Sequence, residues 1–258
     1  MNSAVWQPTS GCGPHCRPAG TEAVRAGTTV LRLSALTAVL LGALVLVPLL
    51  GRAAVRTVCR GLLAALGVRL VWRGPVPRPG SLLVANHVSW LDVVALLAVA
   101  PVRLVAKREV RGWPAVGALA AVTGSIFVDR SRPKSLPGTV AEVTAALRAG
   151  RSVAVFPEGT TFCGAEQGRF RPAVFQAAVD AGAPVMPISI RYASPMAAFV
   201  GDDTLWCSVR RVAALRGLTV TLVGSPALRP EPGADRRSLA RAAQASAGLR
   251  SATFDLAA

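Results

Sequence analysis

A run of eighteen residues without a charged side chain, from Leu33 to Leu50, limits what this chain can fold into. As a helix the run would be about 27 Å long, close to the roughly 30 Å of a bilayer hydrocarbon core. It begins too late for a signal peptide and is followed by no clear small-residue cleavage site. We therefore expect a short membrane span or a deeply inserted hairpin helix; a buried core helix, for which the run is long, is the alternative.

Three arginines follow at every fourth position, Arg52, Arg56 and Arg60, with apolar residues between them. This spacing predicts an amphipathic helix on a membrane surface, with the arginines reaching anionic lipid phosphates. The alternative is a solvated helix that packs on the main domain. More arginines follow the apolar run than precede it, so the positive-inside rule places the body of the protein on the cytoplasmic face of the cell membrane.

The first 28 residues are rich in Gly, Pro, Ser and Thr and predict a disordered leader. Within it, Cys12, His15 and Cys16 could hold a metal, but structural zinc sites take four ligands and the surrounding Gly and Pro favour a loose tail. We therefore predict no metal site. The five cysteines are odd in number and mostly isolated, which is typical of a reducing compartment.

From residue 69 onward, short β-branched runs alternate with helical stretches. This order is typical of an α/β domain with a mostly parallel sheet flanked by helices. The predicted domains are thus the leader, 1–28, a membrane-anchoring pair of hydrophobic and amphipathic helices, 29–68, and a catalytic domain, 69–258. The expected strands are 69–73, 81–85, 103–106, 125–129, 152–156, 185–190 and 218–223. The expected helices are 91–100, 114–122, 139–149, 172–181 and, with Asp235 as its N-cap, 235–249.

The chain has a formal charge of +16, from 29 Lys+Arg against 13 Asp+Glu. Anionic lipid, a phosphate-bearing substrate and nucleic acid are all suitable partners for such a charge. Nucleic acid is disfavoured, because only 5% of the residues are aromatic and no zinc-finger, RNP or basic-zipper pattern occurs.

Only two histidines occur, and His87 lies in the segment NHVSWLD at residues 86–92. This scarcity excludes an HExxH pair or a three-histidine zinc site. Asp92, five residues on, is suited to orient His87 as a general base. Two more charged residues, Arg130 and Glu158, follow other expected strands, where ligands bind in α/β sheets. Taken singly, each has a structural explanation. His87 could be a capping or core histidine. Arg130 could belong to a surface ion pair with Asp129, and Glu158 could belong to a simple turn.

Four segments occur in a specific order: NHVSWLD at 86–92, GSIFVDR at 124–130, FPEGT at 156–160 and VMPISI at 185–190. In this the chain resembles the glycerolipid acyltransferases, the lysophosphatidic-acid (1-acylglycerol-3-phosphate) acyltransferase family, over about residues 50–225. The resemblance implies a glycerol-3-phosphate acyltransferase-like α/β fold. It also implies transfer of an acyl group from a thioester to a lysolipid hydroxyl.

The resemblance assigns roles to the site residues. His87 is the base and Asp92 holds its tautomer, with no covalent intermediate, metal or cofactor required. Lys107 and Arg130 are the candidate cations for the acceptor phosphate, and the turn of Glu158, Gly159 and Thr160 shapes the pocket.

One departure concerns residue 161, where many family members carry an arginine that binds phosphate and this chain has Thr161. Arg169 and Arg171 are candidate replacements. The sequence EGTT also resembles the branch that acylates lyso-ornithine lipid.

We therefore expect a membrane-bound O-acyltransferase that makes phosphatidic acid from 1-acyl-glycerol-3-phosphate, with acyl-CoA or acyl-carrier protein as co-substrate. The basic surface suits an anionic membrane and an acidic carrier. The alternatives are acylation of another lysolipid such as lyso-ornithine lipid, a thioester hydrolase that uses the same pair on water, and a non-catalytic basic membrane adaptor.

Overall fold

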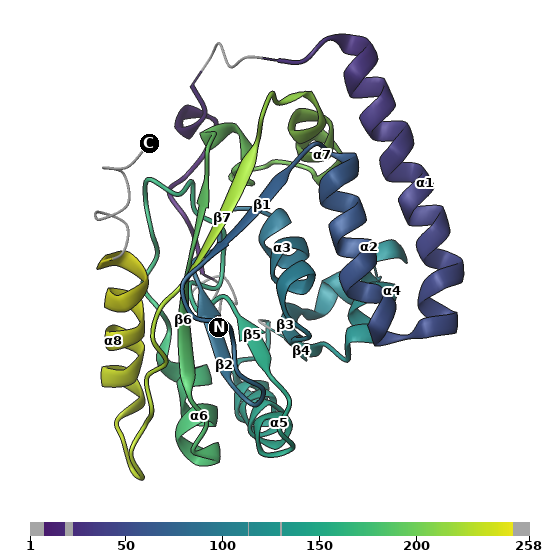
Figure 1. Ribbon diagram of the computed structural model, residues 1–258. Coiled ribbons are helices and arrows are strands. Elements are labelled where there is room, and N and C mark those ends of the chain that lie inside the picture. Colours follow the sequence, from purple (N-terminus) through teal and green to yellow (C-terminus); the bar gives the residue numbers. More distant parts are fainter. Residues whose placement is uncertain (1–7, 19–22, 113, 130, 250–258) are drawn as a thin grey trace.

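A seven-stranded sheet forms the centre of the α/β fold, with strand order β1-β7-β6-β2-β5-β3-β4. The computed structural model describes residues 8–18, 23–112, 114–129 and 131–249 (Figure 1). Neighbouring strands run parallel except for β6 and β7, which are antiparallel. The expectation of a mostly parallel sheet is confirmed. The strands are β1 Arg69–Arg73, β2 Leu82–Ala85, β3 Arg103–Lys107, β4 Ile126–Val128, β5 Val153–Val155, β6 Val185–Tyr192 and β7 Thr219–Gly224.

Helices cover both faces of this sheet. Side chains along a strand point alternately to the two faces, so the central strands contribute to a hydrophobic cluster on either side. On β2, Leu83 and Ala85 join a cluster with α2, α3 and α7, whereas Leu82 and Val84 join a second cluster with α5, α6 and α8 (Figure 1). Since both faces are covered, the central strands β2 and β5 are apolar throughout. The helices are α1 Ala26–Leu50, α2 Arg52–Ala65, α3 Leu91–Val99, α4 Pro114–Thr123, α5 Leu136–Arg148, α6 Phe175–Ala181, α7 Leu205–Ala214 and α8 Arg236–Leu249.

The predicted elements agree with the structure in type, with ends that differ by a few residues. The stretch 172–174 is a 3-10 turn that leads into α6. Asp235 accepts hydrogen bonds from two backbone N–H groups of the first turn of α8, as expected of an N-cap. The helix α7 was not predicted; its N-cap Thr204 accepts a hydrogen bond from the Cys207 N–H at 3.2 Å.

The apolar run belongs to α1, which forms a hairpin with α2 beside the domain (Figure 1). Gly51, at φ +56°, makes the sharp turn between the two helices. By length and composition, α1 is the one helix in the described part of the chain that could cross a membrane. One side of it packs on the core through residues such as Leu36 and Val39, while Leu41 and Leu44 on another side are exposed.

The arginines of α2 do not all point to a lipid surface, which corrects the sequence prediction. Arg56 donates hydrogen bonds to the carbonyls of Ala98 and Val99, and Arg60 donates one to Ala98. Cations next to the last carbonyls of a helix satisfy unpaired acceptors and interact favourably with the helix dipole. Two of the three arginines therefore dock α2 on the carboxyl end of α3, as the alternative of a helix packed on the domain predicts.

Part of the leader also differs from the expectation of disorder. Residues 14–16 form a 3-10 turn, Cys12 is only 5% exposed, and Arg17 pairs with Asp203 at 2.9 Å. Residues 26–28 already belong to α1. Contacts with the domain order residues 8–18, even though their composition is typical of a loose tail; residues 1–7 and 19–22 lie outside the described part of the chain.

Candidate active site

The candidate site lies at the carboxyl ends of three neighbouring strands, β6, β2 and β5. His87 follows β2, Glu158 follows β5, and Tyr192 ends β6. The carboxyl ends of parallel strands share one edge of a sheet, so residues distant in sequence meet there.

His87 and Asp92 form a hydrogen-bonded pair, with His87 Nδ1 at 2.8 Å from Asp92 Oδ2. The ionised carboxylate only accepts hydrogen bonds, so it holds the proton of the neutral ring on Nδ1 and leaves Nε2 as the basic nitrogen. The imidazole also stacks on the Phe156 ring, with centroids 4.0 Å apart, and this contact restricts the tilt of the imidazole ring. The side chain of His87 is 20% exposed and that of Asp92 is fully buried. The pair can therefore act as a base that is open to substrate and held from behind.

Asp92 is held by four donors. Besides His87, its Oδ2 accepts the backbone N–H groups of Val88 at 2.7 Å and Ser89 at 2.9 Å. Its Oδ1 accepts the hydroxyl of Tyr192 at 2.5 Å. Because Asp92 lies in the first turn of α3, the helix dipole also favours its negative charge. The spacing of His and Asp thus produces a tight turn around one carboxylate.

Tyr192 was not predicted from the sequence, although it is the only tyrosine in the chain and lies two residues after the VMPISI segment. Burial raises the pKa of the Tyr192 phenol well above its ordinary value, and the charge of Asp92 raises that pKa further. Tyr192 therefore stays protonated and donates to Asp92 across the physiological range.

Asn86, the residue before the histidine, has a structural role. Its amide donates to the Ile190 carbonyl at 3.0 Å, and its oxygen accepts the Ile190 N–H at 2.7 Å. Asn86 thus binds the end of β2 to β6 and sets the position from which His87 projects.

Glu158, which was expected to help shape the substrate pocket, accepts hydrogen bonds from two backbone N–H groups. Its Oε2 accepts the His87 N–H at 2.6 Å and its Oε1 accepts the Gly168 N–H at 2.9 Å. The pKa of Glu158 is raised to about 7, mainly because the carboxyl group is buried. The two N–H donors lower this pKa, and the nearby charge of Asp92 raises it. Glu158 is therefore a positioning residue that ties the segment of His87 to the loop at Gly168.

The turn after β5 brings one predicted cation to the site. Gly159 has φ +79°, a conformation that favours glycine. Arg171 donates its backbone N–H to the Pro157 carbonyl at 3.0 Å, and its Nε lies 3.7 Å from where a Cβ atom on Gly159 would be. Thr160 is half-buried in the same turn. Arg171 is an exposed residue, and its side chain therefore lies beside the turn that was expected to shape the pocket.

The other predicted binding residues are placed differently. The Thr161 hydroxyl donates to the Phe199 carbonyl, so this side chain connects two loops. Lys107, at the end of β3, is two strands away from β2 and pairs with Glu109 at 3.2 Å. Arg169 is exposed on the loop next to Gly168. Arg130 lies outside the described residues.

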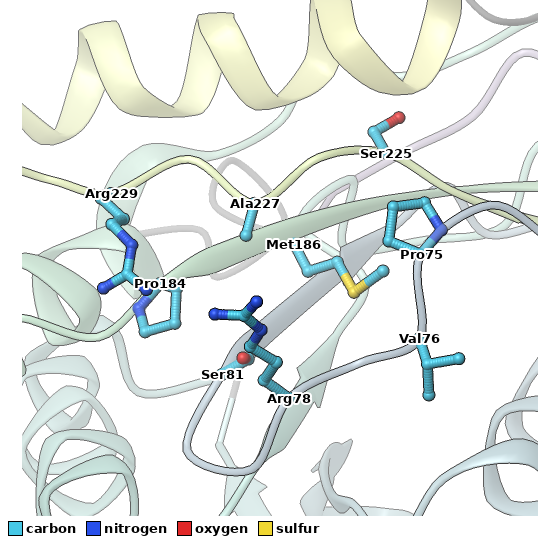
Figure 2. Close-up of a pocket in the computed structure, with 9 residues that line it drawn as sticks. All are labelled: Pro75, Val76, Arg78, Ser81, Pro184, Met186, Ser225, Ala227 and Arg229. Carbon is cyan, nitrogen blue, oxygen red and sulfur yellow. The ribbon is translucent and has the colours of Figure 1, made fainter.

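A cavity of about 230 Å³ lies near the amino ends of β2 and β6, away from the carboxyl ends where His87 is found (Figure 2). Its lining includes Ser81 and Pro184, which immediately precede β2 and β6, and the two arginines Arg78 and Arg229. Because His87 follows β2, this cavity is at the far end of that strand and is not part of the candidate active site.

Comparisons with known proteins agree with this geometry. The sequence profile of the family described as Acyltransferase matches residues 69–191. The chain is 39% identical over 206 residues to a lyso-ornithine lipid O-acyltransferase of Pseudomonas aeruginosa, covering 76% of this chain and 77% of that one. It is 37% identical over 172 residues to a 1-acyl-sn-glycerol-3-phosphate acyltransferase of Neisseria meningitidis, covering 62% of this chain and 66%, just under two thirds, of that relative.

The fold is also found in a solved structure, that of a 1-acyl-sn-glycerophosphate acyltransferase from Thermotoga maritima. The TM-score is 0.66 at 21% identity, over 84% of this chain and 90% of that one. The strand order, the ordered motifs and the similarity to the Pseudomonas relative over three quarters of the chain lead to one conclusion: this chain belongs to the acyltransferase family.

Proposed function

We propose that this protein is a membrane-associated O-acyltransferase that moves a fatty acyl group from a thioester to the free hydroxyl of a lysolipid. The observation that carries the proposal is the His87–Asp92 pair, with Nδ1 bound to a buried carboxylate and Nε2 left as the base. A hydroxyl must lose its proton as it attacks a thioester carbon, and a positioned imidazole is suited to take it.

The reaction needs few protein groups. As His87 Nε2 takes the proton, the acceptor oxygen bonds to the thioester carbonyl carbon, and Asp92 stabilises the imidazolium that forms. Collapse of the tetrahedral intermediate breaks the carbon–sulfur bond, and the imidazolium returns the proton to the leaving thiolate. The acyl group passes directly to the acceptor, so no acyl-enzyme is required.

We assign the acceptor head group to the turn at Gly159 and to Arg171. A guanidinium can bind a phosphate or a carboxylate through two parallel N–H groups. The Arg171 guanidinium lies beside the turn, whose backbone is held by a hydrogen bond from the Gly159 N–H to the Phe156 carbonyl at 3.0 Å. Arg169, Lys107 and Arg130 remain candidates for further contacts with the head group.

Two lysolipids are candidate acceptors: 1-acyl-glycerol-3-phosphate and lyso-ornithine lipid. The Neisseria relative is named for the first and the Pseudomonas relative for the second, at similar identity. We propose 1-acyl-glycerol-3-phosphate, with phosphatidic acid as product, as the first candidate. Lyso-ornithine lipid is the second candidate, for two reasons. The Pseudomonas relative matches a larger share of this chain, and Thr161 supplies no cation at a position where many family members carry an arginine.

We further propose that the hairpin of α1 and α2 anchors the protein, with its catalytic domain on the cytoplasmic face of the cell membrane. The exposed residues Leu41 and Leu44 of α1 offer the apolar surface for insertion. Acyl-CoA or acyl-carrier protein would then deliver the donor from the aqueous side, and the lysolipid would enter from the bilayer.

The test uses the purified protein in vesicles with labelled oleoyl-CoA or oleoyl-carrier protein and either acceptor. The proposal predicts a diacyl lipid and thiol release in equal amounts, with one acceptor preferred. Thiol release with free fatty acid in place of the diacyl lipid would indicate a hydrolase, and no turnover of any donor would indicate an adaptor. Replacing Arg171 by Ala should raise KM for the preferred acceptor about tenfold, the effect of losing about 1.4 kcal/mol of head-group binding, while Arg237→Ala, on exposed α8, should not.

A further inference from the structure

Three of the five cysteines converge in one place. The sulfur atoms of Cys12, Cys16 and Cys163 all lie within 4.8 Å of one another, although Cys163 is far from the other two in sequence. Cys12 and Cys163 are buried and Cys16 is half-buried. The 3-10 turn of residues 14–16 brings Cys16 back beside Cys12. The fold thus supplies the third thiol that the leader itself lacks.

The surroundings of the sulfurs resemble those of a thiolate metal site. The Cys163 N–H donates to Cys12 Sγ at 3.3 Å, the type of backbone hydrogen bond that supports a coordinating sulfur. Val88, Ala198 and Val200 form an apolar shell around the cluster. Glu166 Oε2 lies 4.0 Å from Cys12 Sγ, although this oxygen is not within 4.8 Å of all three sulfurs.

The geometry is close to what a tetrahedral ion requires. Sulfur atoms bound to one Zn²⁺ at about 2.3 Å lie about 3.8 Å apart. Sulfurs already within 4.8 Å reach this spacing by small side-chain rotations. Cysteines separated by two to four residues, as Cys12 and Cys16 are by three, are typical pairs of zinc ligands. Buried cysteines can also be packing residues, but packing alone does not require three sulfurs to face one another.

We propose that Cys12, Cys16 and Cys163 form a binding site for a soft divalent cation, with Zn²⁺ as the probe. Glu166 or water would complete the coordination. The reaction proposed above needs no metal, so this site would have a structural role. It is independent of the acyltransferase proposal.

The site would fasten the leader to the loops of the active site. Pro8 packs on the turn at Gly159, where a Cβ atom would come within 2.8 Å of the proline ring. Phe162, next to Cys163, donates its N–H to the His87 carbonyl at 2.8 Å. A cation held by Cys12 and Cys163 would therefore link the leader to the segment that positions His87. The Arg17–Asp203 pair is a second, metal-independent anchor of the leader.

The test measures metal content in the full-length protein, purified without a polyhistidine tag, under reducing conditions, and incubated with Zn²⁺. After removal of free metal, elemental analysis should find about one zinc per chain. Cys12→Ala, Cys16→Ala and Cys163→Ala should each retain less than about a tenth of that amount. Cys207→Ala, which removes an exposed cysteine elsewhere, should retain it all. Cobalt in place of zinc should give a thiolate-to-metal charge-transfer band that these three variants lose.

Several results would overturn the proposal. Wild-type protein that keeps no zinc would do so, and so would zinc retention in Cys163→Ala, which would assign the ion to the leader alone. A mass lower by two hydrogens, without metal, would show a disulfide instead. Circular dichroism checks that each variant is folded. Cys16 is the least buried of the three, so Cys16→Ala decides the question if Cys163→Ala unfolds.

Discussion

Replacing Asp92 by Asn tests the electrostatic half of the active-site pair. The amide is close in shape to the carboxylate. Its oxygen can face the three donors that Oδ2 now accepts, while its NH2 group can donate to the Tyr192 oxygen. The geometry therefore survives, and the change removes one buried negative charge.

The size of the effect follows from the distance. Two unit charges 2.8 Å apart attract each other by about 6 kcal/mol at an effective dielectric constant of about 20. The imidazolium forms only as the reaction proceeds, so this attraction lowers the barrier and not the energy of the ground state. At 1.36 kcal/mol for each factor of ten, its loss lowers kcat by about 10⁴-fold at most. Because His87 is partly exposed, we expect a loss of about 10³- to 10⁴-fold, similar to that in hydrolase triads.

The assay follows labelled diacyl lipid in vesicles under saturating donor and acceptor. Asp92→Asn should lower kcat and leave KM for the acceptor within about twofold, with a Tm close to that of the wild type. Asp202→Asn, which changes an exposed aspartate in a turn, is the matched control and should be active. A folded Asp92→Asn protein with kcat within tenfold of the wild type would refute the reasoning.

Three further predictions concern other parts of the structure. Tyr192→Phe removes one donor to Asp92 and should lower kcat by about 10- to 150-fold at unchanged KM, since a hydrogen bond to a charged group contributes about 1.5–3 kcal/mol. Glu158 has a pKa of about 7 in the folded protein, above its ordinary 4.5, so the protonated form favours folding. The contribution of Glu158 to stability should be greatest below pH 4.5 and should fall by up to about 3 kcal/mol as the pH rises through 7; denaturant unfolding across this range should show this pH-dependent difference between the wild type and Glu158→Gln. Leu44→Glu places a charge on the exposed apolar side of α1 and should release the protein from vesicles in a flotation assay.

Each of these predictions has a contrary outcome. Full activity of Tyr192→Phe would mean that the phenol does not support the carboxylate. An unchanged pH profile for Glu158→Gln would assign the decline to another group. Leu136→Glu changes an exposed leucine on α5, on the other face of the sheet, and should leave vesicle binding intact. Equal release by Leu44→Glu and Leu136→Glu would argue against α1 as the anchor.

Much of the fold could be predicted because its signals are local. Apolar runs such as Leu82–Ala85 are buried on both faces of the sheet and read clearly as strands. Asp235 marks the start of α8 by its capping chemistry. The short helix α7 was missed, although Thr204 before it was an available N-cap signal.

The candidate site was predictable where both partners lie close together in the sequence, as His87 and Asp92 do at a separation of five residues. Contacts between distant segments were not. Tyr192 reaches Asp92 only because β6 lies next to β2, and Glu158 binds two backbone N–H groups because His87 and Gly168 meet around it. The same applies to Cys163, whose place beside the leader depends on the whole fold.

The role of His87 as the catalytic base is tested most directly by comparing acyl transfer in two histidine variants. His87→Ala removes the proposed base, whereas His15→Ala removes the other imidazole of the chain, which is exposed in the leader. With labelled oleoyl-CoA and the preferred acceptor, we expect His15→Ala to form diacyl lipid at close to the wild-type rate. His87→Ala, although folded, should form less than about a thousandth as much. Diacyl lipid formation by His87→Ala at a rate near that of His15→Ala would contradict the central claim.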